Sequence, residues 1–385
     1  MHFLKLILRN ALRHRLRTAL TVLGLVVAFL SFGLLQTIVD AWYHGAEAAA
    51  PNRLITRNAV SLTIPLPLHY REKVRGVQGV KRVAAANWFA GVYQDPKNFF
   101  PQFAVEPVPY FSMYPEYRLL DQEFRAFLRD RKGVIVGRKL ADTYGFKVGA
   151  AVPLKGTIFP GNWEFIIRGI YDAAEPKTDT SLFFFHWDYL NETMKQRMPL
   201  RANQVGIFVV EVTDVDRAAA VSQEIDKQFR NSIAETLTET EQAFQIGFVK
   251  QTEAIVIAIR IVSFVVIFII LAVMANTMAM TARERLGEYA TLKALGFAPA
   301  YVAALIFGES LAIAGLGCAI GVGLTFPVGD WFASQMGTLF PVFAVSADTV
   351  ALQIACAVAV GAIAAALPAR RAARVRIVEG LRAIG

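Results

Sequence analysis

The chain has 385 residues, of which 55% are hydrophobic and only 18% charged, so it is too apolar for an ordinary soluble domain of this length. The formal net charge of +9 does not indicate nucleic-acid binding, because most of the excess positive charge flanks the long apolar runs, while acidic residues nearly balance the basic ones of the polar segment. Cys318 and Cys356 both lie within apolar runs, so the long polar segment has no disulfide framework. Composition therefore predicts a membrane protein with a folded domain that needs no covalent staples.

The N-terminal residues are basic and precede a long apolar run. Leu4, Ile7, Leu8, Ala11 and Leu12 recur at helical spacing, which predicts an amphipathic interfacial helix over residues 1–17, with a simple basic anchor as the alternative. The first transmembrane helix is predicted at 18–41, where residues 18–39 carry no charge and can cross roughly 30 Å of hydrocarbon. This run is too long for the apolar region of a cleaved signal peptide, which is the competing interpretation.

Residues 42–253 change to short β-rich runs punctuated by glycine and proline, which predicts an α+β domain. Strands are expected at 133–136, 151–154, 163–170 and 205–212. Helices are expected at 68–74, at 138–144 before Gly145, at 216–229, and at 235–251 running directly into the second span. No Ser-His-Asp set and no metal-ligand spacing are visible, so no catalytic and no metal-binding residue is predicted.

Aromatic residues cluster at Phe183–Phe185 with Trp187, and again at Phe99 with Phe100. Such a cluster can form a hydrophobic binding surface, although most clusters of this kind belong to a core.

Three further apolar runs predict transmembrane helices at 254–282, 299–326 and 348–369. They leave a loop at 283–298, a short extracytoplasmic loop at 327–347 and a tail at 370–385. Basic residues cluster before the first span, between the second and third, and after the fourth, which places both termini in the cytoplasm. The predicted fold class is an integral membrane α-helical protein with four transmembrane helices and a large α+β extracytoplasmic domain inserted between the first and second spans.

The third span has two unusual features. Small residues at helical spacing favour close helix packing, either within the chain or against a second copy, at Gly308, Ala312, Gly317 and Gly321. Glu309 is an intramembrane acid, which is costly unless neutral or paired. It is interpreted as a helix contact, with a proton or cargo role as the alternative.

The segment TARERLGEYATLKALGFAP joins the second and third spans. It predicts a break at Gly287 and a short helix over 288–295 that ends at Gly296 in a left-handed conformation. Alternating charges with exposed Tyr289 and Leu292 suit docking to another protein, while an ordinary positively charged loop is the alternative.

This segment and several others resemble those of a known family. ERLGEYATLKALGF resembles the cytoplasmic loop of the MacB/FtsX-type, or type VII, ABC transporter permeases, and PARRAARVRIVEGLR resembles their C-terminal ending. GVIVGRKLADTYGFKVGAAVPL and WEFIIRGIY are similar to the β-rich insertion of their outer domain, here about 120–185, within a porter-like part. The resemblance implies an ATPase-coupling site formed by Arg283, Glu284, Arg285, Glu288, Tyr289, Leu292, Lys293, Leu295 and Gly296.

The resemblance also implies a function. The chain lacks a G-x-x-x-x-G-K-[ST] phosphate loop, so it is expected to be a non-catalytic subunit without a cofactor, with ATP and Mg on a cytoplasmic ABC ATP-binding subunit. A second copy of the chain and the lipid bilayer of the bacterial inner membrane complete the expected assembly. A periplasmic membrane-fusion protein and an outer-membrane channel are further candidate partners.

ATP hydrolysis would then move the outer domain and export or extract a periplasmic or outer-leaflet substrate by mechanotransmission. The alternative is a cell-division type of signalling regulator, which activates a periplasmic cell-wall hydrolase without transport. A membrane-bound enzyme is disfavoured because no catalytic set is visible.

Overall fold

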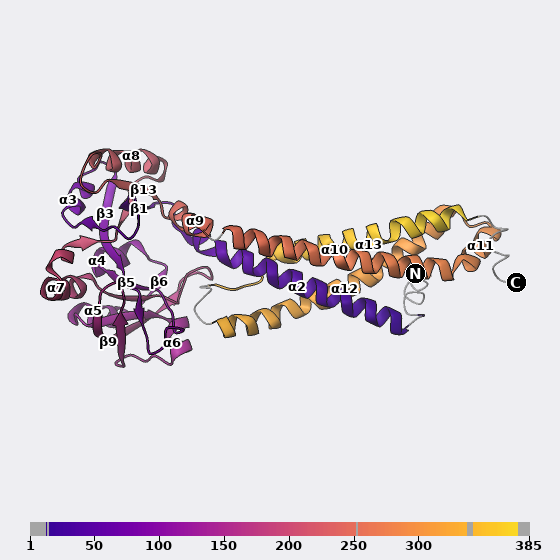
Figure 1. Cartoon of the computed structure of the whole chain (residues 1–385), viewed down its shortest axis with the longest axis horizontal. Coiled ribbons are helices and arrows are strands. Elements are labelled where there is room, and N and C mark those ends of the chain that lie inside the picture. The colour runs from indigo at the N-terminus through magenta and orange to yellow at the C-terminus, as the bar shows by residue number, and fades with distance from the viewer. Residues whose placement is uncertain (1–12, 14, 252, 337–341, 376–385) are drawn as a thin grey trace. The chain divides into compact units, whose positions relative to one another are not determined.

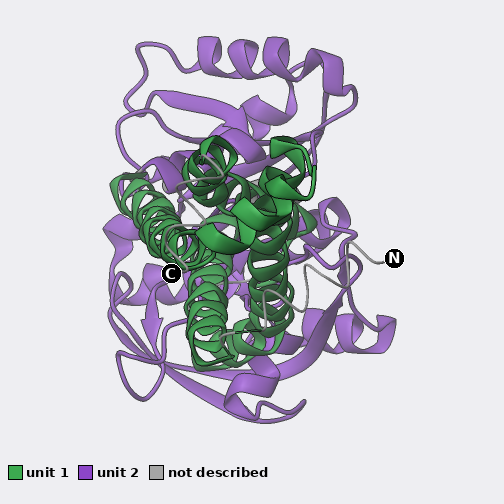
Figure 2. Ribbon diagram, turned by 90° about the vertical axis from the view of Figure 1, so that its right-hand side faces the viewer, with its two compact units in different colours: residues 1–40, 253–335, 343–385 green, residues 41–252, 336–342 purple. Residues whose placement is uncertain are grey.

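The computed structural model describes residues 13, 15–251, 253–336 and 342–375. The chain divides into two compact units, of which the first contains residues 1–40, 253–335 and 343–385 and the second 41–252 and 336–342 (Figure 2). Most of the N-terminal helix predicted at 1–17, and most of the predicted tail, lie outside the described residues.

The first unit is a bundle of long helices. Within the described part of the chain, four helices are long and apolar enough to cross a membrane (Figure 1): α2 (Arg15–Ala48), α10 (Glu253–Glu284), α12 (Pro299–Met336) and α13 (Ala347–Arg374). A short helix, α11 (Leu286–Ala294), lies between α10 and α12. A helix is favoured in these apolar runs because it satisfies every backbone polar group within its own segment.

The helix that contains the predicted third span extends beyond residue 326, because α12 continues through Pro327 to Met336. Proline removes one backbone hydrogen bond, and the surrounding bonds of a long helix carry it past the interruption.

The glycines of α12 bring it close to α2. A Cβ atom on Gly317 would lie 2.5 Å from Cβ of Leu25, and one on Gly321 would lie 2.8 Å from Cβ of Phe29. Both glycines therefore allow α12 to pack against α2 of the same chain, which agrees with the interpretation of packing within the chain. A role of Gly308 and Ala312 in contacts with a second copy stays a prediction.

Buried polar side chains also join the long helices. Gln353 of α13 donates from Nε2 to the backbone oxygen of Phe29 at 2.8 Å, and its side chain is fully buried. Asp40 of α2 accepts hydrogen bonds from Ser346 at 2.8 Å and Thr349 at 2.7 Å, at the start of α13. Hydrogen bonds of this kind fix the register of packed helices where apolar contact alone does not.

The second unit is built on a mixed sheet with the strand order β13-β1-β12-β3-β5-β10-β7-β9-β8-β4, to which β6 is added by pairing with β9. A separate small sheet consists of β11 and β2. The β10–β5 and β7–β9 pairs are parallel and the others antiparallel. The strands are β1 (Arg53–Asn58), β2 (Leu66–Pro67), β3 (Val80–Trp88), β4 (Gly91–Val92), β5 (Gln102–Val105), β6 (Tyr117–Arg118), β7 (Gly133–Gly137), β8 (Ala151–Gly156), β9 (Gly161–Ala173), β10 (Phe183–His186), β11 (Gln204–Val205), β12 (Ile207–Val212) and β13 (Thr236–Thr240).

Helices cover both faces of this sheet. They are α3 (Tyr70–Arg75), α4 (Pro107–Met113), α5 (Asp121–Arg129), α6 (Arg138–Tyr144), α7 (Trp187–Arg197), α8 (Ala218–Gln228) and α9 (Glu241–Gln251), with short 3-10 turns at Pro199–Arg201 and Val215–Arg217. Buried residues of α3, α6, α7 and α8 form one core, and those of α4 and α5 form the other. The sheet therefore has two buried faces, which explains its uninterrupted hydrophobic runs.

The aromatic cluster of β10 shows these two cores directly. Phe183 and Phe185 belong to one core and Phe184 to the other, because successive side chains of a strand point to opposite faces. All three are fully buried and Trp187 is nearly so, which confirms the interpretation as core residues. Phe100 is fully buried as well, whereas Phe99 is half-exposed.

Most predicted elements of the second unit are confirmed. The strands β7, β8 and β9 form where expected, and α6 spans the predicted residues before Gly145, which has φ +67°. The strand predicted at 205–212 is split at Gly206 into β11 and β12. The predicted helices at 68–74 and 216–229 correspond to α3 and α8 with slightly different ends.

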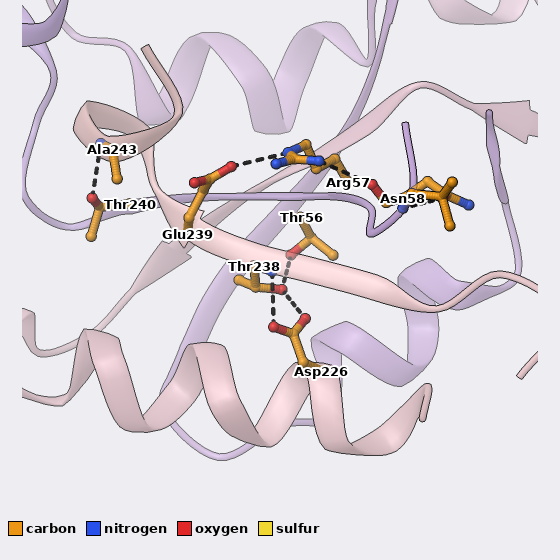
Figure 3. Close-up of polar contacts among 9 residues, drawn as sticks. Thr56, Arg57, Asn58, Asp226, Thr238, Glu239, Thr240 and Ala243 are labelled. Carbon is orange, nitrogen blue, oxygen red and sulfur yellow. Dashed lines mark hydrogen bonds and ion pairs between the residues drawn. The ribbon is translucent and has the colours of Figure 1, made fainter. Parts of the chain in front are cut away.

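The helix predicted over 235–251 is wrong in its first part, because β13 precedes α9. The alternating threonines of β13 favour a strand, which pairs with β1. Asp226 of α8 accepts from the backbone nitrogen of Thr238 at 2.9 Å and from its hydroxyl at 2.7 Å, and that hydroxyl also contacts Thr56 at 3.0 Å (Figure 3). Continuity between α9 and α10 is not described, since residue 252 lies outside the described ranges.

Candidate functional site

The segment between α10 and α12 forms a helix break followed by a capped short helix. Arg285, with φ −105° and ψ 13°, separates α10 from α11, so the break lies two residues before the predicted Gly287. At the other end Gly296 adopts φ +92°. Its nitrogen donates to the Lys293 oxygen at 3.0 Å, and the Phe297 nitrogen donates to the Leu292 oxygen at 3.1 Å. This pair of bonds is a Schellman motif, and it confirms the predicted glycine cap.

Arg285 pairs with the intramembrane acid of α12. Its Nη1 donates to Oε1 of Glu309 at 2.7 Å, and both side chains are only 4% exposed. The arginine is buried because an unpaired carboxylate at Glu309 would cost several kcal/mol, which the ion pair avoids. The part of Arg285 in ATPase coupling stays a prediction. The contact supports a helix-contact role for Glu309.

Tyr289 is also buried, at 4% exposure, and it packs in the apolar core of the bundle. The prediction that its side chain is exposed is wrong, since α11 lays this face onto the longer helices. Burial raises the pKa of Tyr289 to about 12, which keeps its hydroxyl neutral at physiological pH. Leu292 is half-buried against the same core.

Ion pairs connect this segment to the start of α2. Arg17 forms two bonds of 2.8 Å to the carboxylate of Glu284, a bidentate arrangement that fixes the orientation of both side chains. Arg13 pairs with Glu288 of α11. Two residues predicted as coupling positions, Glu284 and Glu288, therefore hold the N-terminal end of α2.

Lys293 connects α11 to the end of α13. Its Nζ donates to the backbone oxygens of Ala373 at 2.6 Å and Val375 at 2.9 Å. The last carbonyls of a helix have no partner within the helix, so a lysine here satisfies them and complements the helix dipole.

The segment Glu284–Lys293 thus makes polar contacts with α2, α12 and α13, and the turn that follows it exposes a small apolar surface. Leu295 is 72% exposed and Phe297 is 42% exposed, and both belong to the turn that follows α11. Arg283 is exposed as well and lies at the end of α10. Sequence reasoning did not single out Phe297, although its place directly after the capping glycine is a usable signal.

A second cluster, in the second unit, was also missed. Arg53, at the start of β1, donates from Nε to Glu241 at 2.5 Å and from Nη2 to Glu116 at 2.7 Å. Its guanidinium lies 4.1 Å from the ring centroid of Tyr114. Arg53 and Glu241 are almost fully buried, and Glu241 begins α9. The cluster therefore ties the strand that follows α2 to the helix that precedes α10 in the chain.

Among the residues that the structure describes, no three His, Cys, Asp or Glu side chains gather in a metal-binding arrangement. The buried His186 instead donates from Nε2 to the Phe127 oxygen at 2.8 Å, and burial lowers its pKa. The site consists of polar helix contacts beside an exposed apolar turn.

The first unit has four long apolar helices and a short helix that is held to them by polar contacts. The second is an α+β unit on a mixed sheet. Together they define a multispan membrane protein with a large folded domain. Comparison with known families agrees. The profile of the MacB-like periplasmic core domain matches residues 18–228, and that of the FtsX-like permease C-terminal domain matches residues 260–377. The chain therefore belongs to the MacB/FtsX-type family of ABC transporter permeases.

Individual relatives are distant. An uncharacterized ABC transporter permease of Methanocaldococcus jannaschii is 22% identical, over 97% of this chain and 96% of its own length. The extracellular domain of the transporter YknZ from Gram-positive bacteria is 14% identical with a TM-score of 0.36, over 49% of this chain and 100% of that domain. The periplasmic region of MacB from Actinobacillus actinomycetemcomitans is 8% identical with a TM-score of 0.37, over 52% and 94%.

Permeases of this kind are generally non-catalytic, and membership implies a cytoplasmic ATP-binding partner.

Proposed function

We propose that this permease transmits the ATP-driven motion of a separate cytoplasmic ATPase to its α+β domain, and that this motion exports or extracts a periplasmic or outer-leaflet substrate. The observation that carries the proposal is the set of polar contacts around α11. Arg285 and Lys293 bond the short helix and its N-cap to α12 and α13, and Glu288 pairs with Arg13, two residues before α2 begins. A force applied to α11 would therefore reach α12 and α13 directly, and α2 through the residues that precede it.

The orientation follows from charge. Basic residues flank the start of α2, the α10–α11 junction and the end of α13, and positive flanks stay in the cytoplasm. Both termini and α11 would face the cytoplasm of a bacterium, and residues 41–252, inserted between the first and second spans, would face the periplasm. The ATP and Mg would be held by the partner subunit.

In this scheme the ATPase docks on the exposed Leu295 and Phe297 beside α11. The helices then shear against one another, and the motion enters the outer domain through the chain connections that lead to β1 and from α9. The Arg53–Glu241 contact would make those two connections move together. Close packing of Gly317 and Gly321 against α2 leaves α12 without space for cargo on that side, which favours transmission over conduction.

The test is a charge placed on the exposed docking surface. In the purified complex with its ATPase, Leu295→Asp should lower the transport-coupled ATPase rate about tenfold or more, because a buried interface position does not accept an unpaired carboxylate. The matched control is Leu200→Asp, at a leucine of the α+β domain that is 92% exposed. If Leu295→Asp left both complex formation and ATPase stimulation at the wild-type level, the docking assignment would be wrong.

A second copy of the chain is expected to complete the assembly, and a membrane-fusion protein and outer-membrane channel are candidate partners of the outer domain. Capture experiments with the full complex distinguish transport from signalling, since a fusion protein supports export and a cell-wall hydrolase supports signalling.

A further inference from the structure

A groove of about 310 Å³ lies between α10 and α13, beside the first residue of α11. Its volume is at the lower end of the roughly 300–1,000 Å³ found for small-molecule sites. Small side chains, including Ala275, Ala279 and Ala364, keep the two helices from filling the space, and Leu367 adds an apolar wall. An apolar groove within a membrane-spanning bundle is open to lipid chains.

Two arginines line one end of this groove. Arg283 belongs to the last turn of α10 and Arg371 to the last turns of α13. Both are exposed, and neither forms an ion pair or a side-chain hydrogen bond with any residue in the described ranges. The nearby carboxylates of Glu284 and Glu309 already bind Arg17 and Arg285. The groove therefore carries two positive charges that no described carboxylate neutralises, so they are available to an anion from outside.

The charged and apolar parts of the groove are arranged along the helix axis. Arg283 and Ala275 are eight residues apart on α10, which corresponds to about 12 Å along a helix. Arg371 and Ala364 span a similar length on α13. The groove thus runs from two guanidinium groups at the helix ends to small apolar side chains deeper in the spans, which matches a molecule with an anionic head and a hydrocarbon tail.

Basic residues at the ends of membrane helices often do no more than set topology and complement the helix dipole. Arg370 and Arg374 of the same helix fit that explanation, because they are exposed and lie outside the groove lining. Arg283 and Arg371 differ because they come from two helices and face one apolar cavity. Guanidinium groups also bind phosphate oxygens in bidentate fashion.

We propose that this groove is a binding site for an anionic glycerophospholipid, whose phosphate contacts Arg283 and Arg371 and whose acyl chain lies along Ala279 and Leu367. The lipid would come from the leaflet at the α11 end of the bundle. It would brace α10 against α13 next to the helix that we assign to ATPase docking. The proposed lipid site requires only that the chain is a membrane protein, so its test is independent of the proposed function.

The test is native mass spectrometry of the full-length chain, purified in a neutral detergent, delipidated, and titrated with phosphatidylglycerol or phosphatidylcholine. Wild-type protein should retain phosphatidylglycerol in preference. Arg283→Gln with Arg371→Gln should weaken phosphatidylglycerol binding about tenfold or more and leave phosphatidylcholine binding unchanged, because only the head-group contacts are lost. Ala279→Phe, which fills the groove, should weaken binding while both arginines remain.

The matched control is Arg370→Gln with Arg374→Gln, which removes the same charge from the end of α13 outside the groove. It should retain wild-type affinity, and inorganic phosphate should not displace the lipid. An equal loss in this control would show a general basic surface instead of a site. Equal binding of the two lipids, displacement by inorganic phosphate, or an unchanged affinity in both groove variants would likewise overturn the proposal.

Discussion

The buried side chains of Arg285 and Glu309 should stabilise the bundle only as a pair. The two side chains are 2.7 Å apart and each is 4% exposed, so little solvent is present to screen a charge that loses its partner. Replacing one member leaves the other buried and uncompensated, at a cost of about 3–5 kcal/mol in the free energy of unfolding. Arg285→Met and Glu309→Leu should each destabilise the bundle by this amount.

The double variant separates the pair from its surroundings. If the two effects were independent, their sum would be about 6–10 kcal/mol. Since the second substitution removes the charge that the first one exposed, Arg285→Met with Glu309→Leu should instead lie within about 2 kcal/mol of the wild type. The difference between these two values is the energy by which the two side chains are coupled.

The assay is unfolding by sodium dodecyl sulfate in mixed micelles, followed by far-ultraviolet circular dichroism for the four members of the cycle. A useful control is Glu288→Gln, since this carboxylate pairs with Arg13 while about half exposed and should cost no more than about 1 kcal/mol. Additive effects of Arg285→Met and Glu309→Leu, or single costs no larger than that of the control, would refute the reasoning.

Three further predictions concern packing, pH and the α+β domain. Gly321→Leu should disrupt the close approach of α12 to α2 and lower the stability of the bundle by several kcal/mol. Gly323→Leu should leave that stability unchanged, since a Cβ atom at Gly323 meets no atom within 4 Å. The same detergent unfolding assay compares the two variants. Burial lowers the pKa of His186 below its ordinary 6.5, so the unfolded chain binds a proton more readily than the folded domain does. The stability measured by chemical denaturation should therefore fall as the pH drops from 6.5 towards the lowered pKa. His186→Gln should remove this dependence of stability on pH. Arg53→Met should cost about 3–5 kcal/mol, because it leaves Glu241 buried without its cation, and Arg53→Met with Glu241→Gln should recover part of it in the same denaturation assay.

The sequence by itself determined the long-range plan of the chain. Uncharged runs identify the four long helices because lipid admits only segments that satisfy their own backbone groups. Gly296 predicted the end of α11 because glycine adopts the left-handed conformation at low cost, and the short β-rich run at 133–136 predicted a strand. These signals are local, so neighbouring residues are enough to decide them.

Tertiary structure decided which charges face a partner and which are buried. Arg285 and Glu309 are 24 positions apart, and nothing in either neighbourhood shows that one neutralises the other. The same holds for Lys293 at the end of α13, and for Arg53 with Glu241 at the two ends of the α+β domain. Thr236–Thr240 formed a strand against a helical expectation, because pairing with β1 and hydrogen bonds to Asp226 hold its alternating threonines in an extended conformation. Such contacts depend on how segments far apart in the sequence pack together, and a local sequence pattern does not show which segments those are.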